Sequence, residues 1–180
     1  QIDAQHALEL LEGLEMDCRG FRPEEMSELR RYCYHVAGTV GLMMSQLMGV
    51  RDPAARQPAI ALGIAMQLTN IARDVREDAL RARSYLPGIA CPLECDEVQV
   101  QQAVKRILAE AEEQYELASI GIHFIPKSCR VAVRVALAVY CEIGREIARQ
   151  AYSVLDRRAV IRRGRLLWVA TLAALSPTRR

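Results

Sequence analysis

Apolar residues recur along this chain every three to four positions, in several stretches separated by short breaks. This spacing is typical of amphipathic helices, because strands instead alternate with a period of two. The pattern predicts helices over residues 3–17, 23–49, 53–82, 97–120, 127–155 and 162–175. Glycine and proline mark several of the breaks, at Gly20, Pro23, Pro87, Gly88 and Pro126. We see no internal repeat, linker or low-complexity stretch, and we expect a single helical domain over residues 1–180.

The composition narrows the class of protein further. Hydrophobic residues make up 51% of the chain, which excludes a disordered protein and allows a sizeable core. The 24 Lys and Arg residues nearly balance the 22 Asp and Glu residues, so nothing indicates a nucleic-acid partner. The 6 cysteines form no Cys-x-x-Cys pair, and we see neither a signal peptide nor a long apolar run. These features favour a reduced, cytoplasmic protein without a zinc site.

The helix predicted over residues 53–82 carries an unusual row of polar side chains. At about 100° per residue, steps of three, four and four place four of them on one stripe: Gln67, Asn70, Asp74 and Asp78. Two aspartates one turn apart repel each other unless a cation lies between them. Mg²⁺ prefers oxygen ligands of this kind and bridges to substrate phosphates. The stripe is therefore a candidate platform for a metal and a diphosphate, with Arg73 and Arg83 available to bind phosphate oxygens.

The same stripe also fits a plainer interpretation, a solvent-exposed helix face that carries ion pairs at i,i+4 spacing. Pairs between Arg73 and Glu77 and between Glu77 and Arg81 would agree with it. The Asp74–Asp78 pair would not, since like charges at this spacing destabilise a helix. Spacing alone leaves both interpretations open.

Two glycines, Gly38 and Gly41, lie inside the helix predicted over residues 23–49, where each costs about 1 kcal/mol relative to alanine. Either close packing against another helix or space for a ligand would account for them. Tyr32, Val36 and Met43 share one face of this helix, which could line an apolar channel.

A basic cluster lies near the C-terminus, formed by Arg157, Arg158, Arg162, Arg163 and Arg165. It fits a solvated face, and it also fits contact with an anionic membrane or a diphosphate. An arginine of this cluster could approach the diphosphate if the last helix folds back onto the bundle, which the sequence leaves open.

Two long segments resemble the signatures of one known family. Residues 32–47 contain Tyr-Cys-x-x-Val-Ala-Gly-x-Val-Gly, and residues 62–87 contain Asn-Ile-x-Arg-Asp-Val-x-x-Asp followed by Arg-x-Tyr-Leu-Pro. Their content, order and separation of about 15 residues resemble the squalene/phytoene synthase family. The phrases YCYHVAGTVGLMM, MGVRD and QLTNIARDV are most similar to bacterial phytoene synthases. The chain as a whole looks like the C-terminal two-thirds of such an enzyme.

The resemblance implies an all-α, isoprenoid-synthase-type helical bundle with a central apolar cavity, lacking the N-terminal helices. It implies a prenyltransferase that joins two geranylgeranyl diphosphates head to head, through prephytoene diphosphate, to phytoene in carotenoid biosynthesis. The implied cofactor is Mg²⁺, with Mn²⁺ as a substitute and no nicotinamide. Alternatives are a squalene or dehydrosqualene synthase that uses farnesyl diphosphate, or a non-catalytic truncated family member. The implied partners are prenyl diphosphates and a membrane surface contacted peripherally.

Carried over position by position, the resemblance also implies residue roles. Three residues would bind the metal: Asn70, Asp74 and Asp78. The two aspartates are also predicted to be catalytic. Substrate binding falls to an amide and arginine set: Gln67, Asn70, Arg73, Arg83 and Arg157. The reacting carbons are faced by two further catalytic residues, Tyr32 and Tyr140.

The chain departs from the family pattern before Tyr32. Family members carry another Asp-x-x-x-Asp motif upstream, whereas the only aspartates here are Asp3 and Asp17, without that spacing. We therefore expect the 180 residues alone to show little or no synthase activity. A milder departure is Ala82, where members usually carry glycine.

Overall fold

Helices account for most of residues 2–176, the part of the chain that the computed structural model describes, and these residues contain no β-strand. The principal helices are α1 (Ala4–Cys18), α2 (Met26–Cys33), α3 (Thr39–Leu47), α4 (Arg56–Arg73), α5 (Val75–Leu80), α6 (Glu97–Ile120), α7 (Lys127–Arg149) and α8 (Arg163–Leu175). Shorter turns are the π-helical η1 (Tyr34–Gly38) and the 3₁₀ segments η2 (Pro53–Ala55), η3 (Pro92–Glu94) and η4 (Gly121–Phe124). The predicted all-helical class is confirmed. Within this range no helix is both long and apolar enough to cross a bilayer.

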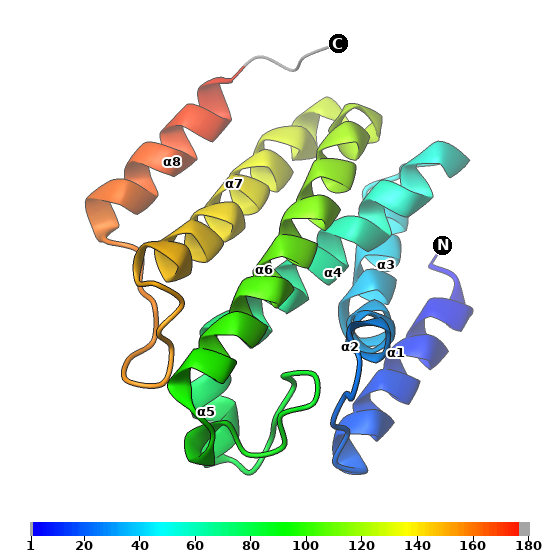
Figure 1. Ribbon diagram of the computed structural model, residues 1–180. Helices are drawn as coiled ribbons and strands as arrows, with labels where there is room; N and C mark the ends of the chain where they lie inside the picture. Colours follow the sequence, from blue (N-terminus) through cyan, green and yellow to red (C-terminus); the bar gives the residue numbers. More distant parts are fainter. Residues whose placement is uncertain (1, 177–180) are drawn as a thin grey trace.

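Helices α4 and α6 form the centre of the fold, with α1, α2 and α3 on one side and α7 and α8 on the other (Figure 1). The contact between α4 and α6 is dominated by aliphatic and small side chains spaced three or four residues apart, which form a continuous buried face on each helix. The fully buried members include Ala65, Leu68 and Ala72 of α4 and Val100, Val104 and Ile107 of α6. This central pair holds the chemistry-bearing end of α4 in a fixed position.

Several helix boundaries differ from the sequence prediction. The helix predicted over residues 23–49 begins at Met26, where Glu25 and Glu28 form a capping box, and it contains a π-helical turn. The helix predicted over 53–82 is interrupted at Asp74. The helix predicted over 127–155 ends at Arg149, because Ala151 and Tyr152 adopt positive φ angles of 52° and 61°.

Two glycines bring α3 and the π-helical turn against α4. A Cβ atom at Gly41 would lie 2.1 Å from the carbonyl oxygen of Ala59, and one at Gly63 would lie 2.1 Å from that of Ala37. Both distances are far below any van der Waals contact, so only glycine allows this approach. Close helix packing therefore accounts for Gly41, one of the two explanations that the sequence left open.

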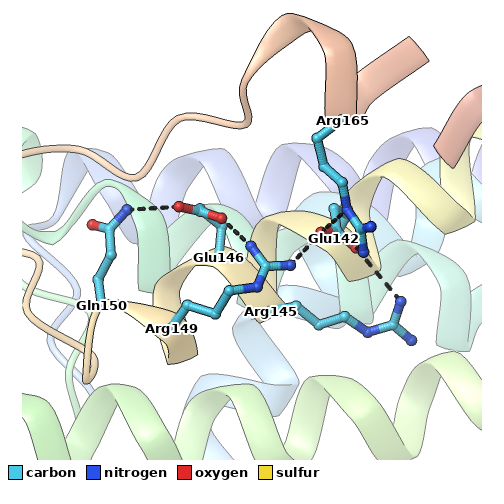
Figure 2. Close-up of polar contacts among 6 residues, drawn as sticks. All are labelled: Glu142, Arg145, Glu146, Arg149, Gln150 and Arg165. Carbon is cyan, nitrogen blue, oxygen red and sulfur yellow. Dashed lines mark hydrogen bonds and ion pairs between the residues drawn. The ribbon is translucent and has the colours of Figure 1, made fainter. Parts of the chain in front are cut away.

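Helix α8 is attached to α7 through an ion-pair cluster around Glu142 (Figure 2). The Glu142 side chain is completely buried, and it accepts hydrogen bonds from Arg149 of its own helix and from Arg165 of α8. The Arg165 Nε–Glu142 Oε1 distance is 2.8 Å, and Arg145 lies 3.6 Å from the other carboxylate oxygen. A buried carboxylate needs such partners, because desolvation of an unpaired charge costs several kcal/mol.

This cluster predicts a pH dependence of stability. The hydrogen bond from Arg165, together with Arg149, lowers the pKa of Glu142 to about 2 from an ordinary value of 4.5. A lowered folded-state pKa means that the stabilisation is present above the ordinary pKa and is lost as the pH falls from 4.5 towards about 2. The difference in unfolding free energy between the natural protein and Glu142→Gln, measured in urea, should be large at neutral pH and shrink through this window. A difference that stays constant with pH would contradict this assignment.

Candidate active site

A polar hollow of about 310 Å³ opens where α4 passes into α5. Its walls come from α1, α2, the α4–α5 junction and the loop after α5. The lining residues are Asp17, Tyr32, Gln67, Asn70, Ile71, Arg73, Asp74, Glu77, Asp78, Arg81, Arg83 and Tyr85. All four residues of the predicted polar stripe therefore face one hollow.

The helix axis bends at Asp74, the residue between α4 and α5. Its backbone angles, φ −103° and ψ 16°, leave the helical range, although its N–H still donates to Asn70 O at 2.9 Å. In a regular helix, neighbouring residues point about 100° apart and cannot pair. The bend accompanies a two-point contact in which Arg73 Nε donates to Asp74 Oδ1 at 2.8 Å and Arg73 Nη2 donates to Oδ2 at 2.5 Å.

The Asp74 carboxylate is bound by arginines on two sides. Besides Arg73, Arg158 donates from Nε to Asp74 Oδ1 at 2.6 Å, across 84 residues of sequence. Burial raises the pKa of Asp74, but the hydrogen bonds and charges of Arg73 and Arg158 outweigh burial and hold the pKa below its ordinary value. Asp74 is thus a stable carboxylate with two guanidinium groups beside it. The i,i+4 pairs of Glu77 with Arg73 and Arg81, which would have agreed with the solvent-face interpretation, are not formed within the described residues.

Asp78 is in the opposite electrostatic situation. Burial raises its pKa, the nearby charge of Asp74 raises it further, and the charges of Arg81 and Arg83 offset this rise only in part. In the part of the chain that the structure describes, its carboxylate has no hydrogen bond or ion pair. Two further oxygens at the hollow, Asn70 Oδ1 and Glu77 Oε2, are buried without a hydrogen-bond partner. Buried oxygens without donors are costly, so this group of atoms would gain free energy from a cation.

The donor set suits a hard divalent ion only in part. Residues 2–176 contain no group of three or more His, Cys, Asp or Glu side chains arranged to hold a metal. Two carboxylates and one amide oxygen nevertheless fit Mg²⁺, which is typically bound by one or two carboxylates and completes its shell with water and substrate phosphate oxygens. The residues present therefore fit a metal that arrives together with a phosphate ligand.

Asp17 anchors two tyrosines at the opposite wall of the hollow. The Tyr85 hydroxyl donates to Asp17 Oδ1 at 2.7 Å, and the Tyr32 hydroxyl lies 3.0 Å from each carboxylate oxygen. The rings of Phe21, Tyr32 and Tyr85 are stacked, with centroid distances of 5.0 Å and 5.1 Å. The stack and the shared carboxylate fix both phenols at the edge of the hollow.

These phenols are neutral hydrogen-bond donors. Burial raises the pKa of Tyr32, and the neighbouring Tyr85 and Asp17 raise it further; burial and Asp17 also raise the pKa of Tyr85 to about 12. Asp17 itself was not predicted as a site residue, because it pairs with no second aspartate. One signal was available: Asp17 lies in the last turn of α1, where a negative charge is unfavourable because of the helix dipole. An aspartate at such a position therefore indicates a role other than stabilising the helix.

An apolar groove of about 270 Å³ adjoins the polar hollow. It runs between α3, α4 and the start of α7, and its lining includes Val36, Val40, Met44, Leu62, Met66 and Val133. Gln67 and Asn70 line both the groove and the hollow, so the two amides stand at their boundary. A ligand with an anionic head and a long hydrocarbon tail would match this pair of spaces.

The structure brings together most of the predicted site residues. Tyr32, Gln67, Asn70, Arg73, Asp74, Asp78 and Arg83 all line the hollow. Tyr140 of α7 lies outside this lining but is near enough to help raise the pKa of Arg73. Arg157 is exposed and does not line the hollow, whereas its neighbour Arg158 contacts Asp74.

Comparison with known proteins agrees with this geometry. The sequence profile described as squalene/phytoene synthase matches residues 1–165. The chain belongs to the squalene/phytoene synthase family. The resemblance inferred from the two signatures is thereby confirmed.

Members of the squalene/phytoene synthase family with curated names include two bacterial relatives. Phytoene synthase from Rhodobacter capsulatus is 37% identical over 180 residues, covering 94% of this chain and 53% of the relative. The 15-cis-phytoene synthase from Pantoea ananas is 39% identical over 169 residues, covering 87% of this chain and 54% of the relative. The chain thus spans about half the length of these relatives.

Solved structures of the squalene/phytoene synthase family show the same fold. A dehydrosqualene synthase in complex with a ligand superposes with a TM-score of 0.85 at 30% identity, covering 96% of this chain and 64% of that one. A squalene synthase from Alicyclobacillus acidocaldarius has a TM-score of 0.77 at 20% identity, and the match covers 84% of this chain and 62% of that one. At this identity the match supports the fold alone. The predicted isoprenoid-synthase-type bundle is confirmed.

Proposed function

We propose that this chain carries the diphosphate-binding half of a prenyltransferase that condenses two prenyl diphosphates head to head. The preferred substrate is geranylgeranyl diphosphate and the product phytoene, formed through prephytoene diphosphate. The single observation that supports this most is the junction at Gln67 and Asn70, where an acidic, arginine-bearing hollow meets an apolar groove. The names of the relatives favour phytoene over squalene or dehydrosqualene as the product.

Arginine side chains around the hollow would bind the diphosphate. Arg73 and Arg158 hold Asp74 from two sides, and Arg83 lines the hollow near Asp78. Guanidinium groups form strong two-point contacts with phosphate oxygens. An arriving diphosphate would compete with Asp74 for these arginines, and the carboxylate released by the exchange would become available to a cation.

Asp74, Asp78 and Asn70 would hold Mg²⁺, or Mn²⁺ in its place, since their oxygens fit a hard cation completed by phosphate and water. When bound, the metal supplies positive charge that stabilises the leaving diphosphate. The protein's own part is to fix these oxygens: α4 is packed against α6, and the bend at Asp74 sets the direction of its carboxylate. The proposed reaction uses no nicotinamide.

The apolar groove and the tyrosines would protect the reacting carbons. Loss of diphosphate from an allylic substrate leaves a carbocation, which water would destroy, so the reaction needs an apolar environment. Val36, Val40 and Met66 provide such a surface beside the hollow. Tyr32 stays neutral and its hydroxyl group donates a hydrogen bond to Asp17, so it presents a phenol oxygen and a ring face rather than a base. Tyr140 would lie at the same carbons.

Contact with a membrane surface is also proposed, through α8 and the loop before it. Residues 157–175 contain five arginines and no acidic residue. Leu167, Trp168 and Leu175 of α8 are 68%, 58% and 76% exposed. Exposed leucine and tryptophan beside arginines suit the interface of an anionic bilayer, which is also where prenyl substrates dissolve.

The proposed function is tested by product analysis. The 180-residue chain, and any longer product of its gene, is incubated with Mg²⁺ and either geranylgeranyl or farnesyl diphosphate, with and without NADPH as the hydride donor that squalene formation requires, and hydrocarbons are identified by mass spectrometry. Phytoene from the longer substrate supports the proposal. Squalene or dehydrosqualene from the shorter one supports the alternative substrate. Absence of any hydrocarbon in every protein form would contradict a synthase function.

A further inference from the structure

The loop between α7 and α8, residues 150–162, reaches the polar hollow from a distant part of the chain. It follows Arg149 and precedes Arg163, and it runs towards the end of the bundle where α5 lies (Figure 1). Its residue Arg158 donates to Asp74 Oδ1 at 2.6 Å. The loop therefore delivers one of the two guanidinium groups that hold Asp74.

Both ends of this loop are attached to the same buried carboxylate. Arg149, the last residue before the loop, and Arg165, shortly after it, both donate to Glu142 (Figure 2). Arg165 makes two contacts, at 2.8 Å to Oε1 and 3.2 Å to Oε2. Glu142 is fully buried, and among residues 2–176 it is the carboxylate that forms an ion pair with both arginines, whereas Glu146 pairs with Arg149 alone, so Glu142 closes the loop at its base.

Between its two ends the loop is held by apolar packing, in which Tyr152 and Leu155 also contact the core, and by one side-chain hydrogen bond. Val154 and Ala159 are buried, and Ser153 donates to Glu97 Oε1 at 2.8 Å. The segment has no regular secondary structure, and its backbone N–H groups form hydrogen bonds only at residues 150–153, which precede Arg158. The position of Arg158 should consequently depend on where the two ends of the loop are held.

We propose that Glu142 is a positioning residue: by binding Arg149 and Arg165 it closes the loop at residues 150–162 and thereby holds Arg158 at the diphosphate site. Glu142 does not line the polar hollow, so it acts on the site only through the loop. The effect on diphosphate binding rests on the proposed function, whereas the closure of the loop does not.

The first test measures loop closure without metal or substrate. Trypsin cleavage after Arg157 and Arg158 is followed by mass spectrometry under native conditions in the unaltered chain and in Glu142→Gln. We expect cleavage to accelerate about tenfold in the variant, because a neutral amide binds the two guanidinium groups much more weakly than a carboxylate does. Glu110→Gln is the matched control, since Glu110 is a buried partner of Arg30 at 2.7 Å in the α2–α6 contact, far from the loop in sequence. Equal cleavage rates in Glu142→Gln and the unaltered chain would overturn the proposal.

The second test asks whether Glu142 acts through Arg158. The affinity for inorganic pyrophosphate with Mg²⁺ is measured by calorimetry in Glu142→Gln, Arg158→Ala and the double variant. We expect each single change to weaken binding about tenfold, and the double variant to be no weaker than Arg158→Ala alone. Losses that multiply would mean that Glu142 acts by another route and would overturn the proposal.

Two safeguards keep the outcomes distinguishable. If Glu142→Gln does not fold, Arg165→Gln replaces it, because this change frees only the far end of the loop and leaves Glu142 paired with Arg149. It should accelerate cleavage in the same direction, and unchanged cleavage would again overturn the proposal. A complete absence of pyrophosphate binding in the unaltered protein would count against the proposed function, while the cleavage experiment would still decide whether Glu142 closes the loop.

Discussion

Asp78→Asn is expected to weaken Mg²⁺-dependent pyrophosphate binding by at least about 100-fold while leaving the fold intact. Asp78 is partly buried beside Asp74, and its carboxylate forms no hydrogen bond or ion pair within the described residues. Asparagine keeps the shape but removes the charge that a cation requires. The same change relieves repulsion between the two aspartates, so the unfolding free energy should stay unchanged or rise by a few tenths of a kcal/mol.

Calorimetry with pyrophosphate and urea unfolding together check this prediction. Glu116→Gln serves as the control, because Glu116 is an exposed carboxylate on α6 outside the lining of the hollow. It should change neither quantity. Pyrophosphate affinity in Asp78→Asn equal to that of the unaltered protein would exclude this residue as a metal ligand. A large fall in stability would show that Asp78 has a structural role instead.

Gly63→Ala is expected to destabilise the protein by about 2–3 kcal/mol. The new methyl group would lie 2.1 Å from the carbonyl oxygen of Ala37 and 2.9 Å from the backbone nitrogen of Gly38. These are backbone atoms of the π-helical turn, so they can move only if the whole turn moves away from α4. Alanine normally gains about 1 kcal/mol over glycine in a helix, and the contact must exceed this gain.

The matched control for Gly63→Ala is Gly144→Ala, in the C-terminal part of α7. There an added Cβ would lie 3.4 Å from a methyl group of Leu108, an ordinary contact. This change should stabilise the protein by up to about 1 kcal/mol through helix propensity. Both variants are compared by urea unfolding. If Gly63→Ala unfolds at the same urea concentration as the unaltered protein or a higher one, the close contact between α4 and the π-helical turn is wrong.

The apolar periodicity was sufficient to predict the helices, because each buries one face against its neighbours. It could not predict the break at Asp74, where the backbone bends as Arg73 and Arg158 bind the carboxylate. One of these partners lies 84 residues away, and no local pattern encodes such a contact. Helix α7 was predicted too long for a local reason: Ala151 and Tyr152 take positive φ angles that neither residue type signals.

In the candidate site, too, local patterns predicted some residues, and contacts between distant parts of the chain determine the others. The polar stripe on α4 and α5 followed from the spacing of four residues, and all four line the hollow. Asp17 was not predicted because its role depends on Tyr32 and Tyr85, which belong to other parts of the chain. Glu142 was missed for a similar reason. A glutamate in an amphipathic helix normally faces solvent, whereas Glu142 is buried and paired with Arg165 of α8, a contact from a later part of the chain.

The most direct test of the central claim is a crystal structure of the protein with Mg²⁺ and a prenyl thiodiphosphate, an analogue that resists ionisation. We expect the diphosphate in the polar hollow, with Asp74, Asp78 and Asn70 on the metal and arginines on the phosphate oxygens. The hydrocarbon tail should pass Gln67 and enter the groove beside Val36 and Met66. A diphosphate bound elsewhere, or a metal without either aspartate in its coordination shell, would contradict the proposed site.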